Sequence, residues 1–272
     1  MGNAMRIVRL CFQIAVIYSA GTSIAFADED LQAKLANPVA DLISVPFQWT
    51  TYNNAGSQET PRQTLNIQPV YPMNLGGGWS LINRAILPIS SDPGHVPGQD
   101  RVTGLGDITY EGFFAPTPTK KGGLIWGFGP IFVMPTATDD RLGQGKWQAG
   151  PAFLALQETA KWTVGGLVTQ VWSFAGDGQR KNVNYFSLQP IISYRINPKY
   201  SLGYIGTVTG DWTEHQSGER WTVPIGAALS VLTKPKNFVP LNFSAGVGYN
   251  AVKPSDAPDW YFRFQVTLIF PK

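Results

Sequence analysis

The residues that could support catalysis in this chain are few and far apart in sequence. Only two histidines, His95 and His215, could act as a general base, and neither accompanies a Gly-x-Ser-x-Gly motif. Nucleophilic catalysis needs a nucleophile, a base and a group that orients the base, all within hydrogen-bond reach. We therefore predict no catalytic residue, and a hydrolase stays a distant alternative.

Metal and phosphate sites are weakly indicated as well. Asp139, Asp140 and Asp177 carry the oxygen ligands that calcium prefers, but their spacing matches no calcium-binding loop. The three glycines at 76–78 precede an extended segment rather than a helix, which indicates a turn and not a phosphate-binding loop. The sequence predicts no metal site and no cofactor.

Seven charged residues share a different property, because each lies on the polar side of a segment in which apolar and polar residues alternate. These residues are Arg84, Asp107, Glu111, Arg195, Asp211, Arg220 and Arg263. What they can do depends on the elements that hold them and on which side of those elements faces water.

The first 27 residues have the features of a cleaved secretory signal peptide. Arg6 and Arg9 form its positive region, residues 10–20 are apolar apart from one glutamine, and Ala-Phe-Ala at 25–27 fits the small-x-small cleavage rule. An uncleaved anchor helix is the alternative, but the apolar run is shorter than the roughly 20 residues that a membrane span needs. We predict export and cleavage after Ala27.

The mature chain is nearly neutral and rich in aromatic residues. Removal of Arg6 and Arg9 from the 21 basic residues leaves 19, against 18 acidic residues, and no basic run suggests a nucleic-acid partner. Charged residues make up 14% of the chain and aromatic residues 12%, nine of them Trp, whereas soluble domains average about 25% charged. Cys11, the only cysteine, lies in the signal peptide, so we expect no disulfide and no thiolate site.

The last alternating segment, Trp260 to Phe270, shows the pattern over its whole length. Phe262 and Phe264 lie on one face, and Arg263 and Gln265 lie on the other, because successive side chains of a strand point to opposite faces. A soluble β-sandwich would show the same alternation with its apolar face inward. A strand of this kind that closes an exported chain is typical of an outer-membrane barrel, with its apolar face toward lipid.

Twelve alternating segments follow the signal peptide. The most regular are 186–195, 200–212, 220–231, 241–250 and 260–270, and the earlier ones lie at about 42–51, 64–72, 79–89, 105–115, 124–135, 147–156 and 162–174. Interior prolines such as Pro69, Pro190 and Pro224 remove a ladder donor, so they must lie at bulges or strand ends. No segment after the signal could form a membrane helix, so a chain that crosses a bilayer must do so as a closed barrel.

The fold class predicted is therefore all-β: a single antiparallel up-and-down transmembrane β-barrel of about 12 strands. Its domains are the signal peptide at 1–27, a periplasmic N-terminal segment at 28–41 and the outer-membrane barrel at 42–272.

The gaps between segments and the positions of Trp support this barrel. Counted from a periplasmic N-terminus, alternate gaps should be long and extracellular, and the others short and periplasmic. The first set is 52–63, 90–104, 136–146, 175–184, 213–219 and 250–259, and the second is 73–78, 116–123, 157–161, 197–199 and 233–240. The first set is longer and richer in Gly, Asp and Asn, and all nine Trp lie near strand ends, as interfacial aromatic girdles require.

In such a barrel the seven charged residues are predicted to line the lumen, because a charge on the lipid face costs about 2–4 kcal/mol near the midplane. They could form salt bridges that plug a structural barrel, or they could line a selective water-filled path. About eight strands leave room for side chains or one small ligand, and about 16–18 leave a channel, so this barrel lies between the two. Inward Gly203, Gly226, Gly246 and Gly248 remove bulk on one wall, which favours a narrow pore.

Several short motifs together resemble a known family. They are LNIQP at 65–69, GLGD at 104–107, PTAT at 135–138, WSFAGD at 172–177, RWTVP at 220–224 and DWYFRF at 259–264. The set resembles the outer-membrane proteins associated with the meta-pathway of phenol degradation, which are described as transporters. The resemblance covers nearly all of the mature chain and implies a bacterial outer-membrane barrel that passes aromatic or other small organic molecules. The chain ends in Phe270-Pro271-Lys272, which departs from the terminal aromatic residue of many outer-membrane barrels.

The sequence thus predicts a bacterial outer-membrane barrel, not an enzyme, that acts as a narrow pore or transporter for small molecules, aromatic ones included. A closed structural barrel is the alternative, and an outer-membrane lipid hydrolase is a distant one. The expected partners are outer-membrane lipid, the barrel-assembly machinery and a small-molecule solute.

Overall fold

Alternating residues form strands over most of the chain in this computed structural model, which describes residues 28–53, 61–94, 99–117 and 122–270. The strands are β1 (Ile43–Asn53), β2 (Arg62–Ile67), β3 (Val70–Gly76), β4 (Trp79–Asp92), β5 (Val102–Leu105), β6 (Ile108–Pro116), β7 (Leu124–Met134), β8 (Lys146–Glu158), β9 (Trp162–Gly176), β10 (Asn184–Arg195), β11 (Tyr200–Tyr204), β12 (Val208–Asp211), β13 (Trp221–Thr233), β14 (Leu241–Val252) and β15 (Trp260–Phe270). Two short helices, α2 (Asp28–Leu35) and α3 (Ser217–Arg220), precede β1 and β13. None of the helices in the described ranges is long and apolar enough to cross a membrane. The predicted signal peptide, 1–27, lies outside those ranges.

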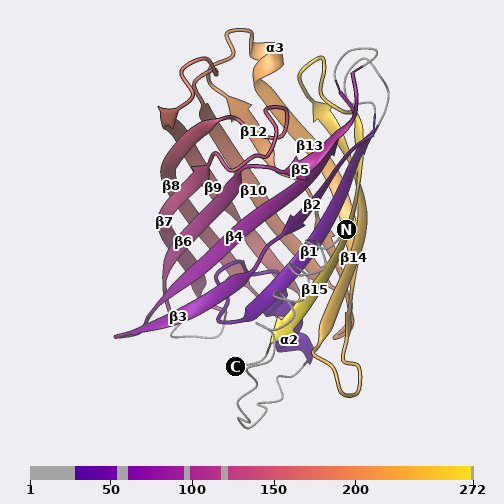
Figure 1. The fold of residues 1–272 in the computed structure, drawn as a ribbon. Coiled ribbons are helices and arrows are strands. Elements are labelled where there is room, and N and C mark those ends of the chain that lie inside the picture. The colour runs from indigo at the N-terminus through magenta and orange to yellow at the C-terminus, as the bar shows by residue number, and fades with distance from the viewer. Residues whose placement is uncertain (1–27, 54–60, 95–98, 118–121, 271–272) are drawn as a thin grey trace, which may run out of the picture.

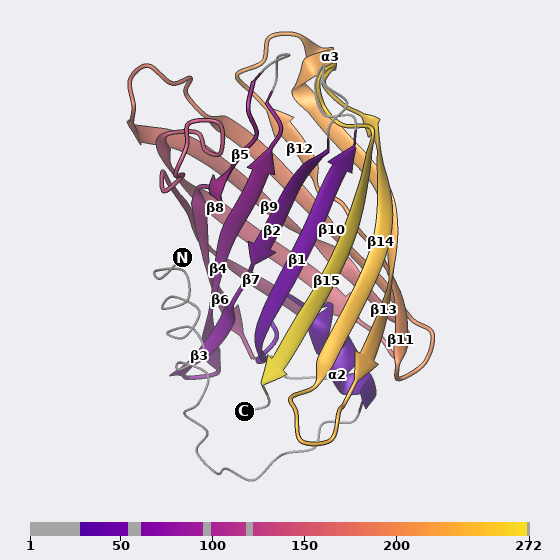
Figure 2. The ribbon, with the colours of Figure 1, turned by 45° about the vertical axis from the view of Figure 1, so that its right-hand side comes forward.

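The strands form one antiparallel sheet that closes on itself. β1 pairs with β15 along its whole length, so the first and last strands lie side by side in Figure 2. The ladder continues through every neighbour to β14 and back to β15. The pairs β2 with β3, β5 with β6, and β11 with β12 each form one interrupted strand, and the barrel therefore has 12 strands, as predicted (Figure 1).

The connections are sorted between the two ends of the barrel. At one end, called the loop end here, the connections between β1 and β2, β4 and β5, β7 and β8, β9 and β10, β12 and β13, and β14 and β15 include α3 and residues 135–145. The opposite end, the turn end, has connections as short as residues 77–78 and 159–161. The described parts of the predicted long and short gaps therefore lie at opposite ends.

The interrupted strands explain several of the interior prolines, whereas Pro130 and Pro151 are register partners within β7 and β8. Pro69 lies in the break between β2 and β3. Residues 205–207 separate β11 from β12. Pro190 of β10 and Pro224 of β13 lie beside this break, where the pairing with β11 and β12 is interrupted. A proline has no N–H to donate to a ladder, so it fits where a neighbouring strand is interrupted. A register shift also occurs between Val223 and Pro224.

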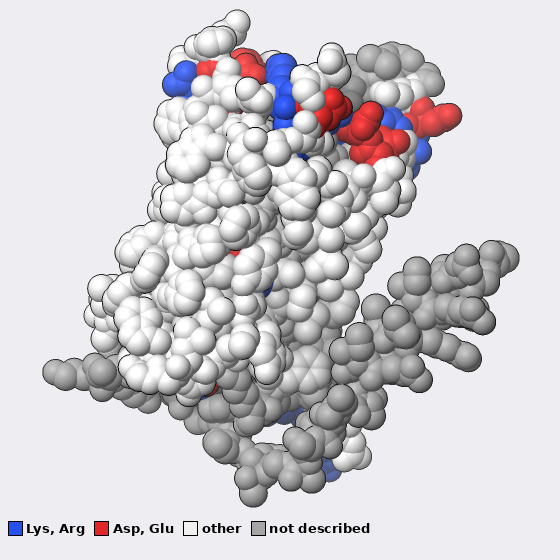
Figure 3. All heavy atoms as spheres, turned by 60° about the vertical axis from the view of Figure 1, so that its left-hand side comes forward, with Lys and Arg blue, Asp and Glu red and all other residues white. Residues whose placement is uncertain are grey.

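The outward face of the barrel is an apolar band. On β15, Phe262 and Phe264 are 46% and 44% exposed. The adjacent Tyr261 is 3% exposed and faces the interior. Figure 3 shows that Lys, Arg, Asp and Glu gather at the loop end, above a broad band of uncharged side chains. The band has the character of a lipid-facing surface.

Aromatic clusters border this band at both ends. The rings of Trp212 and Trp221 lie 5.4 Å apart at the loop end, and those of Trp79 and Trp126 lie 5.8 Å apart at the turn end. Two belts at opposite strand ends are the arrangement expected of interfacial girdles.

Candidate functional site in the barrel lumen

One half of the inner wall is apolar and closely packed. Its buried side chains come from β4, β6, β7, β8, β9 and β10: Ile82, Phe113, Ala115, Ile131, Ala152, Leu154, Leu156, Leu167, Val171 and Ile191. The sequence predicts a polar inner wall, and this half differs from that expectation. In β8, Phe153 and Leu154 are both apolar, so the pattern could not tell that Phe153 is 51% exposed and Leu154 fully buried.

The other half of the inner wall is polar and borders a cavity of about 270 Å³. Its wall comes mainly from β1, β4, β10, β11, β13, β14 and β15, and the N-terminal segment closes one side. Amide and hydroxyl side chains dominate the wall, among them Gln48, Gln68, Gln189, Asn242, Ser244 and Gln265. We call this space the lumenal cavity.

Arg84 and Glu111 form an ion pair beside the lumenal cavity. They are register partners on β4 and β6, and Nη1 of Arg84 lies 3.2 Å from Oε2 of Glu111. Nη2 of Arg84 donates a second hydrogen bond to Oε1 of Gln68 at 2.6 Å. Arg84 lines the cavity, whereas Glu111 is only 5% exposed and does not line it. The charge of Arg84 is thus balanced within the wall.

Arg263 reaches the same cavity from β15 and has different surroundings. Its guanidinium carbon lies 5.6 Å from the centre of the Tyr261 ring, within the range of a cation–π contact. The hydroxyl of Tyr261 donates to the carbonyl of Ile205 at 2.7 Å, which anchors the ring. Nε of Arg263 is buried and has no hydrogen-bond partner in the described part of the chain.

The inward glycines make room for this tyrosine. A Cβ added to Gly248 would lie 2.1 Å from Cζ of Tyr261, and one added to Gly226 would lie 2.8 Å from Cα of Gly248. The sequence predicts an open path beside these glycines, but the Tyr261 ring occupies the space over Gly248. Gly203 lines the lumenal cavity, and no atom lies within 3.4 Å of a Cβ added there.

Three of the predicted lumen-lining residues hold structure at the loop end. The carboxylate of Asp107 accepts hydrogen bonds from the backbone N–H groups of Ala137 and Gln144 at 3.2 and 2.6 Å. Asp211 accepts two from Thr213, at 2.9 Å from its N–H and 2.7 Å from its hydroxyl. Both carboxylates therefore shape loops.

Arg220 also lies at the loop end, in α3. Its Nη2 donates to the carbonyl of Glu214 at 2.9 Å, and its guanidinium carbon lies 5.6 Å from the centre of the Trp212 ring. Trp212 is 41% exposed, so Arg220 lies at the rim and away from the lumenal cavity.

Arg195 is 6% exposed and lies at the turn end. Its Nη1 donates to the hydroxyl of Thr163 at 2.9 Å, its Nε donates to the carbonyl of Ala160 at 3.1 Å, and its Nη2 donates to the carbonyl of Thr159. The side chain fastens the turn between β8 and β9. Of the seven predicted residues, only Arg84 and Arg263 line the lumenal cavity.

The N-terminal segment enters the barrel at the turn end. Leu31 of α2 is 2% exposed and packs in one cluster with Leu42, Leu232 and Ile269. Nε2 of Gln32 donates to the carbonyl of Lys199 at 2.9 Å.

Farther along this segment, Val39 packs against the apolar half of the inner wall. Residues 31–42, most of the segment predicted to be periplasmic, therefore lie against the inner wall and border the lumenal cavity. A segment this short carries no periodic pattern that could have placed it there.

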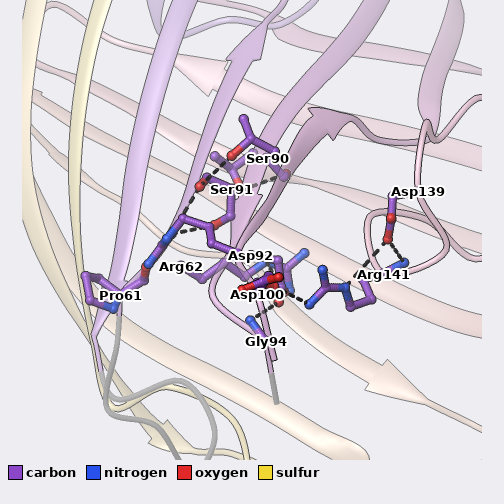
Figure 4. Close-up of polar contacts among 12 residues, drawn as sticks. Pro61, Arg62, Ser90, Ser91, Asp92, Gly94, Asp100, Asp139 and Arg141 are labelled. Carbon is purple, nitrogen blue, oxygen red and sulfur yellow. Dashed lines mark hydrogen bonds and ion pairs between the residues drawn. The ribbon is translucent and has the colours of Figure 1, made fainter. Parts of the chain in front are cut away.

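The loop end is cross-linked by polar contacts (Figure 4). Nε of Arg62 lies 3.8 Å from the carboxylate of Asp92, whose side chain is 1% exposed. Nη1 of Arg141 donates to the carbonyl of Asp100 at 2.9 Å, and its Nε lies 3.6 Å from Asp139. These contacts join three of the six connections at the loop end.

Among the described residues, the candidates for catalysis and metal binding form no metal-binding group. His215 is exposed in the loop between β12 and α3, and His95 lies outside the described residues. Among the described residues, no group of three or more His, Cys, Asp or Glu could hold a metal ion.

A known protein family matches this sequence, and solved structures share its fold. The model of the family described as "Putative MetA-pathway of phenol degradation" matches residues 62–264. The COG4313 outer membrane channel from Pseudomonas putida F1 is similar in structure with a TM-score of 0.58 and 15% identity, over 84% of this chain and 94% of that one. The NanC porin gives a TM-score of 0.53 and 10% identity, over 85% and 99% of the two chains. Outer membrane phospholipase A from Escherichia coli gives 0.45 and 12%, over 90% and 98%. No curated protein matches the chain in sequence.

Proposed function

Because the chain belongs to the family of the MetA-pathway of phenol degradation, we propose that it is a channel of the bacterial outer membrane for small molecules. The closed barrel with an apolar outer band supports a place in a bilayer, since only helices and closed barrels satisfy their backbone groups there. The proposal includes export with the signal peptide cleaved after Ala27. Lipid and the barrel-assembly machinery are its proposed partners.

The observation that carries the proposal is the lumenal cavity. It lies between the polar half of the inner wall and the N-terminal segment, and its volume of about 270 Å³ is large enough for a small organic molecule. The apolar half of the wall narrows the lumen on the opposite side. A narrow path is therefore expected rather than a wide aqueous pore, and the family description supports aromatic compounds as solutes.

The experiment is a conductance measurement on the folded mature protein in planar bilayers. We expect small, discrete conductance steps, because the path is narrow. Liposome swelling with small solutes should show uptake that declines steeply with solute size. Folded protein that inserts into bilayers without any conductance and without swelling would contradict the channel.

A closed structural barrel is the second candidate. The packed apolar half of the lumen and the N-terminal segment favour it, because together they fill much of the interior. The same measurement separates the two candidates, since a closed barrel conducts neither ions nor solutes.

A further inference from the structure

We propose that the lumenal cavity contains a binding site for the carboxylate group of a small organic anion, with Arg263 as its principal contact. The biological meaning of this site rests on the proposed channel function, which it deepens by naming the charge class of the solute. Binding itself can be tested without transport.

The charge on the cavity wall favours an anion. Three basic side chains line the cavity from three separate elements: Lys34 on α2, Arg84 on β4 and Arg263 on β15. Among the described residues that line it, there is no Asp or Glu. Arg84 is paired with Glu111 at 3.2 Å and Lys34 makes a contact of its own, so Arg263 supplies the charge that remains for a ligand. The cavity therefore presents positive charge.

Arg263 has unused hydrogen-bonding capacity. Its Nε is buried without a hydrogen-bond partner, and no carboxylate forms an ion pair with it in the described part of the chain. Buried donors in folded proteins are nearly always satisfied by the protein, by water or by a ligand. A guanidinium presents its donors in a planar fork that matches both oxygens of a carboxylate.

The guanidinium of Arg263 is held in place before any ligand arrives. It lies over the ring of Tyr261, and the Tyr261 hydroxyl is fixed to the carbonyl of Ile205 at 2.7 Å. Gly248 leaves the space that this ring occupies. A preorganised donor loses less entropy when it binds, so the arrangement suits recognition.

Size and surroundings narrow the class of ligand. The volume of about 270 Å³ lies just below the roughly 300–1,000 Å³ of pockets that hold drug-sized ligands. The side-chain amides of Gln48, Asn242 and Gln265 line the same cavity and can donate to further oxygen atoms. A small monocarboxylate fits these properties, and a large or highly charged anion does not.

The binding test compares benzoate with benzamide, an uncharged molecule of nearly the same shape. Saturation-transfer NMR on the mature protein in detergent should show contact with benzoate and much weaker contact with benzamide. Arg263→Gln should lose the benzoate signal. Arg220→Gln, which removes an arginine at the rim, should keep it. Equal binding of both probes, or full benzoate binding by folded Arg263→Gln, would overturn the site.

A second measurement uses the reversal potential in a potassium chloride gradient near 0.1 M, where charges are not fully screened. The wild type should prefer chloride, and Arg263→Gln should move the permeability ratio toward one. Glu111→Gln should move it the other way, because it releases the charge of Arg84.

The two measurements keep the site and the channel distinguishable. Conductance without anion preference, together with no benzoate binding, overturns the site and leaves the channel. Absence of conductance with Arg263-dependent benzoate binding supports the site and overturns the channel. Folding of each variant is checked first by its unheated mobility in gel electrophoresis.

Discussion

Phe264 and Gln265 are adjacent on β15 and have opposite surroundings. Phe264 is 44% exposed on the apolar outer band, whereas Gln265 lines the lumenal cavity and donates to Thr267 at 3.0 Å. Phe264→Arg places a charge in lipid and should destabilise the folded barrel by about 2–4 kcal/mol near the midplane. Gln265→Arg adds the same charge beside water and should fold almost normally.

The measurement is the urea midpoint of unfolding in lipid vesicles. Tolerance of Phe264→Arg together with unfolding of Gln265→Arg would show that the register of β15 is shifted by one residue, since such a shift exchanges the two faces.

Gly248 and Gly203 test whether Tyr261 fills the space that the inward glycines leave. Gly248→Ala places a methyl group against the ring, because its Cβ would lie 2.1 Å from Cζ. The ring must move and its hydrogen bond with Ile205 must weaken, so we expect a loss of about 1–3 kcal/mol, as for other overpacked sites. Gly203→Ala has ordinary contacts and should change stability little.

The midpoint of heat unfolding, followed by gel mobility, compares these two variants. If Gly248→Ala and Gly203→Ala melt together with the wild type, the ring is not packed on Gly248 as described.

At the scale of elements, alternation predicted the strands well where one face is polar. β14 and β15 alternate strictly, and both were placed within two residues of their observed ends. The pattern failed where both faces are apolar, as around Leu154 in β8, because burial inside the barrel and exposure to lipid select the same side chains. Alternation also does not reveal the break at residues 205–207. Beside this break, the hydroxyl of Tyr204 donates to the carbonyl of Pro224 at 2.6 Å.

The sequence predicts the candidate site only in part, for a related reason. Alternation gives the face on which a charge lies, but not what it contacts there. Arg195 and Arg263 both lie on inward faces. Arg195 donates hydrogen bonds to carbonyl groups of a turn, whereas Arg263 reaches the cavity. The contacts of Arg195 cross 32 to 36 residues of sequence, and no local pattern contains them.

The N-terminal segment is the element whose removal should widen the lumen. Leu31 anchors it with 2% exposure, and truncation of a buried leucine to alanine costs about 2–5 kcal/mol. Leu31→Ala should therefore loosen the segment and increase single-channel conductance and its fluctuations. Leu124→Ala is the control, because Leu124 is 66% exposed on the outer band near the same end.

Planar-bilayer recordings of both variants give the answer. Identical conductance in Leu31→Ala and the wild type, with both proteins folded, would mean that the segment does not restrict the path.

For the whole molecule, the sorting of connections predicts its orientation. Single cysteines at Gly178 and Gly218 lie at the loop end, and those at Lys199 and Lys236 lie at the turn end. The predicted mature chain has no cysteine of its own, so each substitution gives one reactive thiol. The first pair should react with a membrane-impermeant maleimide on intact cells, and the second pair only after the outer membrane is opened.

Gly178 and Gly218 suit this purpose because no atom lies within 4 Å of a Cβ added at either position. Labelling of Lys199→Cys and Lys236→Cys on intact cells, with protection of the other pair, would invert the proposed orientation.

The cluster that holds α2 links the N-terminal segment to the last strand, because Leu31 shares it with Ile269 of β15 and Leu232 of β13. Its docking surface does not exist until β13 and β15 have taken their places and β15 has paired with β1. In the predicted mature chain, α2 is therefore the first element in sequence but docks on a surface that the last strand completes. We expect residues 28–42 to be cleaved by added protease in a chain stalled before barrel closure and to be protected in the closed barrel.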